Sequence, residues 1–265
     1  MNNEKPVTVI VPTYNRPDYL ERLLISMESN RDFIEEVIIV NDHSTNAEEY
    51  LKVIERFKQV YSLVYIYNEK NMGAPYCRNI GIKLSKTKYL AFTDDDDEWL
   101  PNKLELQLKK MQADIGLVYT WALSIDESGK QGYKYDSLYS GSDITNLLKS
   151  NFIPSSSVLA NKAAIVKAGG FDLKMVSCQD WDMWLRVMKK GYKIDVVPKE
   201  LLIYHLHKSA SIGKSTKAKK GYRRFYKKHF LCYIHYFIKN SSFRAYIMDG
   251  IRRRVNGKLF RKNNR

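Results

Sequence analysis

The residues best suited to chemistry in this sequence are an acidic run at positions 94–98, four aspartates followed by a glutamate. The run directly follows the apolar segment 89–92, which predicts a buried strand. Neighbouring carboxylates repel one another, and at the end of a strand this repulsion favours a positively charged partner. One such partner is a divalent cation that prefers oxygen ligands, and the alternative is a solvated acidic loop.

Alternating strand and helix patterns position this run within the first hundred residues. Apolar runs predict strands, and amphipathic patterns predict helices between them; the strands are 7–11, 36–40, 63–67 and 89–93, and the helices are 17–30, 46–58 and 75–84. Such repeated units predict an open, Rossmann-like and mostly parallel sheet with right-handed crossovers. Ligands bind such sheets beyond the carboxyl ends of the strands. The loops 12–16, 41–45 and 94–99 all lie at that edge, so the acidic run falls where a ligand is expected.

The second half of the sequence is less regular. Its patterns predict a helix at 101–112, a hairpin over 115–135 and a strand at 152–160. Further helices are expected at 161–168 and 180–188, and two short strands at 193–197 and 201–205. The whole pattern predicts an α/β fold with flanking helices.

Composition excludes several classes of protein. The chain has 265 residues, of which 44% are hydrophobic, so a sizeable core is expected. Its cysteines, Cys77, Cys178 and Cys232, form no C-x-x-C pair, which argues against a disulfide framework or a zinc site and favours a reducing compartment. No secretory signal pattern and no long apolar segment occurs, so we expect a cytoplasmic location without a membrane-spanning helix.

Charge is distributed unevenly along the chain. The formal net charge is +15, and 18 of the 44 Lys and Arg residues lie after position 207, against the single acid Asp249. We therefore expect a near-neutral domain at 1–207 and a basic, aromatic-rich helical region at 208–265. A basic region of this kind favours an anionic surface, either a membrane or a nucleic acid.

Five sequence motifs, in a fixed order, resemble those of the inverting family 2 glycosyltransferases. They occupy residues 9–16, 37–45, 71–81, 92–101 and 169–186, and the similarity spans about residues 7–207. The resemblance implies a nucleotide-diphospho-sugar-binding α/β fold of the GT-A type. It also implies a metal at an Asp-x-Asp motif and transfer of a sugar with inversion.

The resemblance assigns the acidic run to the metal and the donor. Asp94 and Asp96 correspond to the Asp-x-Asp pair, with Asp96 binding Mn²⁺ or Mg²⁺ and Asp94 holding the ribose or sharing the ion. The uninterrupted run leaves the register open by one residue, so Asp95 is a further candidate. A divalent cation neutralises the charge that develops on a diphosphate leaving group, and one or two carboxylates suffice to hold it.

Other motif residues are expected around the nucleotide. Asp42 follows a predicted strand and can accept a hydrogen bond from the N3–H of a pyrimidine, although it could instead cap the helix that starts near residue 46. The family usually has Gly where His43 stands. Arg78 is expected to face the aspartates or the pyrophosphate, the alternative being a structural ion pair. The predicted nucleotide-sugar-binding residues are Pro12, Thr13, Tyr14, Asn15, Asp42, Asn71, Gly73, Arg78, Asp94 and Asp95.

Asp180 is the predicted general base, which would take the proton of the attacking hydroxyl group. The family usually has a Glu-Asp pair here, and this chain has Gln179-Asp180. A helix-capping role for Asp180 and a catalytic role for Asp182 are the alternatives. His207 is a further predicted metal ligand, because some related transferases place a histidine near the metal, and its alternative is an exposed or packing role.

Together these features predict a metal-dependent, inverting transferase that moves one sugar from a UDP-sugar to an acceptor glycan. The acceptor is expected to be lipid-linked or part of a surface polysaccharide, and the absence of a Gln-x-x-Arg-Trp sequence argues against a processive synthase. The basic region is expected to hold the enzyme on the anionic inner face of the cell membrane. The alternatives are a dTDP- or GDP-sugar donor, a nucleotide binder without transfer, and a nucleic-acid-binding protein. No nucleic acid is expected, because the aspartates would repel its phosphates.

Overall fold

The chain was analysed as a computed structural model that describes the backbone of residues 5–206 and 216–263, with side chains up to residue 253 except Lys217. The contacts divide the chain into two compact units, Met1–Gly221 and Tyr222–Arg265. Helix α8 (Thr216–Lys239) runs across this division. His207, the predicted metal ligand, lies outside the described residues.

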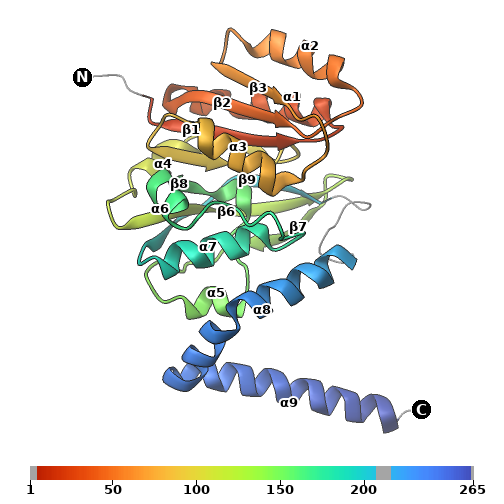
Figure 1. Ribbon diagram of the computed structural model, residues 1–265, viewed down its shortest axis with the longest axis vertical. Helices are drawn as coiled ribbons and strands as arrows, with labels where there is room; N and C mark the ends of the chain where they lie inside the picture. The colour runs from red at the N-terminus through yellow and green to blue at the C-terminus, as the bar shows by residue number, and fades with distance from the viewer. Residues whose placement is uncertain (1–4, 207–215, 264–265) are drawn as a thin grey trace. The chain divides into compact units, whose positions relative to one another are not determined.

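The first half of unit 1 is the predicted parallel α/β arrangement. It consists of β1 (Val7–Thr13), α1 (Pro17–Ser26), a 3-10 helix η1 (Glu28–Phe33), β2 (Ile34–Asn41), α2 (Ala47–Phe57), β3 (Leu63–Tyr67), α3 (Ala74–Leu84) and β4 (Tyr89–Phe92). The strands pair in the order β3-β2-β1-β4, all parallel. The predicted fold class is therefore confirmed, and all three strand ends that were expected to face a ligand lie at one edge (Figure 1).

Alternation along the strands explains how both faces of this sheet are covered. Val9 and Val11 belong to a cluster with the buried leucines of α1, whereas Ile10, between them, faces α3. Gly81 allows the close approach of α3, since a Cβ atom at this position would lie 2.5 Å from the side chain of Ile10. The nearly continuous apolar strands of the sequence follow from burial on both faces.

The second half of unit 1 extends the same sheet with strands of mixed direction. Its elements are β5 (Glu98–Trp99), α4 (Lys103–Leu108), β6 (Ile115–Asp126), β7 (Gln131–Tyr135), α5 (Thr145–Lys149), η2 (Ser155–Ser157), β8 (Leu159–Asn161), α6 (Lys162–Lys167), α7 (Gln179–Lys189) and β9 (Lys193–Leu206). The order continues as β4-β8-β6-β9-β5, with β7 on β6. Helices α3, α6 and α7 lie in front of the sheet in Figure 1.

Three predictions about this half were wrong in detail. The predicted strand at 152–160 is a 3-10 turn followed by the three-residue β8, because Ser157 Oγ bonds back to Pro154 O at 2.7 Å and closes the turn. The two predicted strands at 193–205 are one strand, β9, in which residues 198–199 bulge out of register around Pro198. The helix predicted at 101–112 covers only residues 103–108.

The second unit is helical, as predicted from its sequence. It contains the greater part of α8 and all of α9 (Ser241–Asn263). The two helices meet at a tight junction, where Asn240 Oδ1 accepts a hydrogen bond from Phe243 N at 2.8 Å. Phe243 is fully buried there and its ring lies 5.9 Å from that of Tyr233. No helix among the described residues is long and apolar enough to cross a membrane.

Candidate active site

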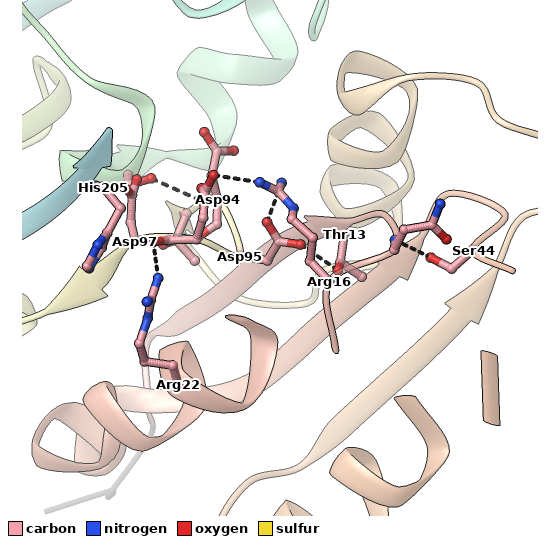
Figure 2. A network of polar contacts seen from close by, with 12 residues as sticks. Thr13, Arg16, Arg22, Ser44, Asp94, Asp95, Asp97 and His205 are labelled. Atoms are coloured by element: carbon pink, nitrogen blue, oxygen red, sulfur yellow. Dashed lines mark hydrogen bonds and ion pairs between the residues drawn. The ribbon is translucent and has the colours of Figure 1, made fainter. Parts of the chain in front are cut away.

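The loops that follow β1 and β2 bind each other at the carboxyl edge of the sheet. Asn15 N donates to Ser44 Oγ at 2.8 Å (Figure 2). Thr45 N donates to Asn15 Oδ1 at 2.9 Å. Thr13 is buried and faces inward, whereas Tyr14 is 44% exposed beside it. The two loops therefore form one surface next to the acidic run, with the Tyr14 ring available to a ligand.

Arg16 neutralises the middle of the acidic run. Its Nη2 atom lies 2.6 Å from Asp95 Oδ1, and its Nη1 atom lies 2.6 Å from Asp96 Oδ2. Asp95 is fully buried and accepts from Thr13 Oγ1 at 2.6 Å, and burial raises the pKa of Asp95 to about 7 against the opposing charge of Arg16. The side chains of Asp94 and Asp96 are 34% and 17% exposed, so these two carboxylates can reach a ligand and Asp95 faces inward.

The end of the run is fixed by β9 and α1. His205 N donates to Asp97 Oδ1 at 3.2 Å, and His205 Nε2 lies 2.7 Å from Glu98 Oε1. Arg22 reaches the same region, with Nε 3.3 Å from Glu98 Oε1 and Nη2 donating to Asp96 O at 2.7 Å (Figure 2). Burial, reinforced by the neighbouring aspartates, raises the pKa of Asp97. Asp97 and Glu98 thus shape the loop.

The exposed pair Asp94 and Asp96 fits a hard divalent cation. Both carboxylates lie at the carboxyl end of β4, and both are paired with guanidinium groups, which shows that this position favours positive charge. Two carboxylates match the number that Mg²⁺ usually takes from a protein when phosphate oxygens supply further ligands. In the part of the chain that the structure describes, no group of three or more His, Cys, Asp or Glu side chains is arranged to hold a metal ion.

Arg78 connects the acidic run to helix α7. It is 5% exposed, its Nη2 atom lies 2.5 Å from Asp94 Oδ1, and its Nη1 atom donates to Gln179 Oε1 at 2.9 Å. Its guanidinium also lies 5.3 Å from the centre of the Phe171 ring. The predicted donor site and the predicted base are therefore brought together through one buried arginine.

Asp180 lies in the first turn of α7 and is held on both oxygens. Its Oδ1 atom accepts from Trp181 N at 2.8 Å, and its Oδ2 atom accepts from Asn151 Nδ2 at 2.9 Å. Burial raises the pKa of Asp180, and these two hydrogen bonds oppose the rise. A carboxylate that is held in place and made more basic by burial is suited to accept a proton.

Asp182, the alternative base, is in a different environment. It is fully buried, and its Oδ2 atom lies 2.8 Å from both Nε and Nη2 of Arg186. Arg186 also donates to Ala168 O at 2.5 Å. Asp182 is therefore part of a buried ion pair that joins α7 to the end of α6, and it is not available to a substrate.

Asp42 anchors the loop before α3. Its Oδ1 atom accepts from Asn68 Nδ2 and Met72 N, each at 2.8 Å, and its Oδ2 atom accepts from Gly73 N at 2.7 Å. Asn71 Nδ2 binds the backbone oxygen of Asp42 at 3.1 Å. The alternative role as a cap of α2 is not observed, because the cap position is Asn46 and has no side-chain cap bond.

Two residues in this region, Gly73 and His43, have positive φ angles. Gly73 has φ 85° and begins α3, and His43 has φ 69°. L-residues adopt this region with strain, whereas Gly, which has no Cβ atom, adopts it readily. His43 is exposed, and its Nδ1 atom lies 3.2 Å from Asn68 O, a local contact that supports the unusual conformation.

A model of the family described as "Glycosyltransferase like family 2" matches residues 8–252. The chain belongs to this glycosyltransferase family. It is 30% identical over 227 residues to an uncharacterized glycosyltransferase of Methanocaldococcus jannaschii, covering 83% of this chain and 77% of that protein. It is also 30% identical to TuaG of Bacillus subtilis, a glycosyltransferase named for teichuronic acid biosynthesis, with 89% of this chain and 96% of that protein covered.

A solved structure supports the GT-A fold of this glycosyltransferase. Residues 1–349 of S. aureus TarS, in complex with UDP-GlcNAc, match with a TM-score of 0.65 at 20% identity. The match covers 83% of this chain and 65% of the TarS chain. The chain thus spans less than two thirds of that solved chain, and the likeness concerns the fold.

Several residues that contact the candidate site were missed in the sequence. Arg16 lies inside a recognised motif but had no assigned role, and Arg22 lies one and a half turns further along α1. Asn151 has no sequence signal, because it lies in an irregular segment 29 residues before Asp180. Ser156, whose Oγ atom accepts from Asp94 N at 2.9 Å, was assigned to a strand. Of these residues, only Arg16 could have been found from the sequence, because it ends the predicted Pro-Thr-Tyr-Asn-Arg turn.

Proposed function

We propose that this glycosyltransferase transfers one sugar, with inversion, from a UDP-sugar to a hydroxyl group of an acceptor glycan. The observation that supports it best is the double contact of Arg78, which joins Asp94 of the acidic run to Gln179 beside Asp180. Donor-binding and base residues thus share one site, as transfer between two bound substrates requires. A nucleotide binder without transfer has no need of this arrangement.

The loops at the sheet edge are proposed to bind the nucleotide. Tyr14 offers an exposed ring to the base, and Asp42 Oδ2, which accepts one backbone hydrogen bond, has a further lone pair for a pyrimidine N3–H. The anchoring of Asp42 by Met72 N and Gly73 N holds this oxygen in place. A pyrimidine donor, UDP or dTDP, is favoured over GDP by this acceptor.

The diphosphate is proposed to lie between the acidic run and Arg78. Asp94 and Asp96 would hold Mn²⁺ or Mg²⁺, which when bound neutralises the charge on the departing diphosphate. Arg78 is buried, and its guanidinium group supplies a positive charge at the same position. Donor affinity is therefore expected to depend on both the carboxylates and the arginine.

Asp180 is proposed to act as the general base. As the acceptor oxygen forms its bond to the anomeric carbon, its proton passes to the Asp180 carboxylate and the bond from that carbon to the diphosphate oxygen breaks. Attack from the face opposite the leaving group inverts the anomeric configuration. Asn151 keeps the carboxylate oriented toward the acceptor through its 2.9 Å hydrogen bond.

The acceptor is proposed to be a growing polysaccharide, lipid-linked at the membrane. TuaG and the E. coli protein WcaA are named for teichuronic acid and colanic acid biosynthesis, and each is 30% identical to this chain. Exposed apolar and basic side chains alternate on α8 and suit the anionic inner face of a cell membrane. The apolar ones include Tyr222, Tyr226, Phe230, Leu231, Ile234 and Ile238.

The proposal is tested by a thermal-shift screen of nucleotide-sugars with Mn²⁺, followed by product analysis. UDP-sugars with Mn²⁺ should raise the unfolding midpoint more than dTDP-, GDP- or CDP-sugars, because a ligand that binds the native state stabilises it. The anomeric configuration of the product, read by NMR from ¹J(C,H) couplings, should be opposite to that of the donor. Retention of configuration, or no response to any UDP-sugar, would contradict the proposal.

A further inference from the structure

Arg16 contacts the carboxylate of Asp96, which is one of the two carboxylates proposed to bind the metal. Its two terminal nitrogens lie 2.6 Å from Asp95 Oδ1 and 2.6 Å from Asp96 Oδ2. The Asp96 side chain is 17% exposed, whereas Asp95 is fully buried. A guanidinium and a divalent cation repel each other, so they compete for the Asp96 carboxylate.

Arg16 is the arginine of this site that is best placed to move. Its side chain is 36% exposed, against 6% for Arg78. Its backbone is fixed independently, since Arg16 N donates to the Tyr50 hydroxyl at 2.7 Å, so the side chain can swing while the loop stays in place.

The position of Arg16 also faces the nucleotide loops. It directly follows Tyr14 and Asn15 and precedes α1, whose first turn begins at Pro17. In Figure 2 its guanidinium lies between the loop that carries Thr13 and the aspartates. A diphosphate lying between the nucleotide loops and Asp96 would be within reach of the released guanidinium, which binds phosphate oxygens in a two-armed geometry.

We propose that Arg16 is an exchangeable counter-cation that couples metal binding to donor binding. Without nucleotide, Arg16 holds Asp96 and weakens binding of the bare metal ion. When the metal arrives with the diphosphate, Arg16 leaves Asp96 and binds the diphosphate. This inference rests on the proposed function, and it adds that metal and UDP each strengthen the binding of the other by the same factor.

The experiment is a titration with Mn²⁺, followed by electron paramagnetic resonance, on the full chain with and without UDP. Arg16→Met should bind Mn²⁺ alone about fivefold or more tightly than the wild type, because the competing cation is gone. The same variant should bind UDP with Mn²⁺ more weakly, so the factor by which UDP strengthens Mn²⁺ binding should fall. Opposite changes in the two affinities are the signature of exchange.

Arg22→Met is the matched control, since Arg22 contacts Glu98 and the backbone oxygen of Asp96 but not its carboxylate. It removes the same charge beside the same acidic run, so its effect on bare Mn²⁺ measures general electrostatics alone. Arg16→Lys keeps the charge but loses the two-armed contact, so its affinities for Mn²⁺ with and without UDP should lie between those of the wild type and Arg16→Met. This variant replaces Arg16→Met in the experiment if Arg16→Met does not fold.

The outcomes separate this inference from the proposed function. If the wild type binds Mn²⁺ and UDP together but Arg16→Met binds bare Mn²⁺ no more tightly than Arg22→Met, the exchange role is overturned and the proposed function stands. If the wild type binds no Mn²⁺ even with UDP, the metal site of the proposed function fails, and the exchange role fails with it.

Discussion

Asn151 Nδ2 donates a 2.9 Å hydrogen bond to Asp180 Oδ2 from outside the helix that carries Asp180. The other carboxylate oxygen is bound by the backbone of Trp181, at the helix start. Both donors favour the ionised form of Asp180, whereas burial raises its pKa. We therefore expect the pH dependence of transfer to reflect this balance and to respond to the loss of the Asn151 hydrogen bond.

Replacing Asn151 by Leu should move the acidic limb of the pH–rate profile to higher pH. Loss of the donor removes a group that lowers the pKa of Asp180, so the base becomes protonated at a higher pH than in the wild type. Turnover should fall most at acidic pH and recover in part toward alkaline pH. Full pH profiles of kcat for both proteins check this, and a uniform loss at every pH would indicate misplacement of the base alone.

Replacing Asp180 by Asn should lower kcat by about 10²- to 10⁴-fold, the usual contribution of a positioned general base. Binding of UDP with Mn²⁺, measured by calorimetry, should be retained, because Asp180 does not contact the nucleotide loops. Wild-type turnover in this variant would refute the assignment.

Asp182→Ala is the matched change two residues along the same helix. It leaves the largely buried Arg186 without its carboxylate, which should cost about 3 kcal/mol or more of unfolding free energy. The expected result is a lowered unfolding midpoint with nucleotide binding retained by the folded fraction. Normal stability in Asp182→Ala would show that the buried pair contributes little.

Lys103 should make the stability of the protein depend on pH. Its side chain is fully buried with Nζ 4.1 Å from the centre of the Trp99 ring, and burial lowers its pKa from 10.5 to about 7. Between these values the unfolded chain binds a proton that the folded chain does not, so stability should rise with pH from about 7 toward 10. Below pH 7 both states are protonated and this contribution becomes constant.

Lys103→Met isolates this contribution, because it keeps the length of the side chain without the amine. The difference in unfolding free energy between wild type and variant, measured by urea denaturation, should change steadily between pH 7 and 9.5, in favour of the wild type as pH rises. At pH 6 the variant should be the more stable of the two. A difference that does not vary with pH would contradict the lowered pKa.

The exposed apolar side chains of α8 should support binding to anionic membranes. Phe230 and Leu231 are 60% and 79% exposed, and Lys227 and Lys228 precede them. The double change Phe230→Ser and Leu231→Ser should weaken sedimentation of the full chain with phosphatidylglycerol vesicles about tenfold, since burying each large apolar side chain contributes roughly 1.5–3 kcal/mol when complete.

Leu138→Ser is the control for that experiment, because Leu138 is 68% exposed in the other unit of the chain. It should leave vesicle binding unchanged, and vesicles of phosphatidylcholine alone should bind all proteins weakly. Equal sedimentation of the α8 variant and the wild type would exclude a membrane role for this surface.

The parallel half of the fold could be predicted because its signals are local. Strands β1, β2 and β4 are largely buried apolar runs, and the loops after them carry turn residues in recognisable motifs. The second half was less predictable because its strands depend on partners far away in the chain. No local pattern around Ser156 indicates that its hydroxyl group accepts a hydrogen bond from Asp94 N. Similarly, no local pattern indicates that Pro198 lies in a bulge within one long strand.

The sequence by itself determined the family, the positions of the acidic run and Asp180, and the edge of the sheet where they would lie. These follow from motifs and from strand order, which are properties of short segments. Only the tertiary structure decided which carboxylates face the ligand, because that depends on burial and on cations from other segments. Arg16 and Thr13 hold Asp95 inward, Arg78 holds Asp94 toward Gln179, and Arg186 removes Asp182 from the site. The sequence makes each of these residues an acid, but its burial, its partners and its role depend on the neighbours that the fold provides.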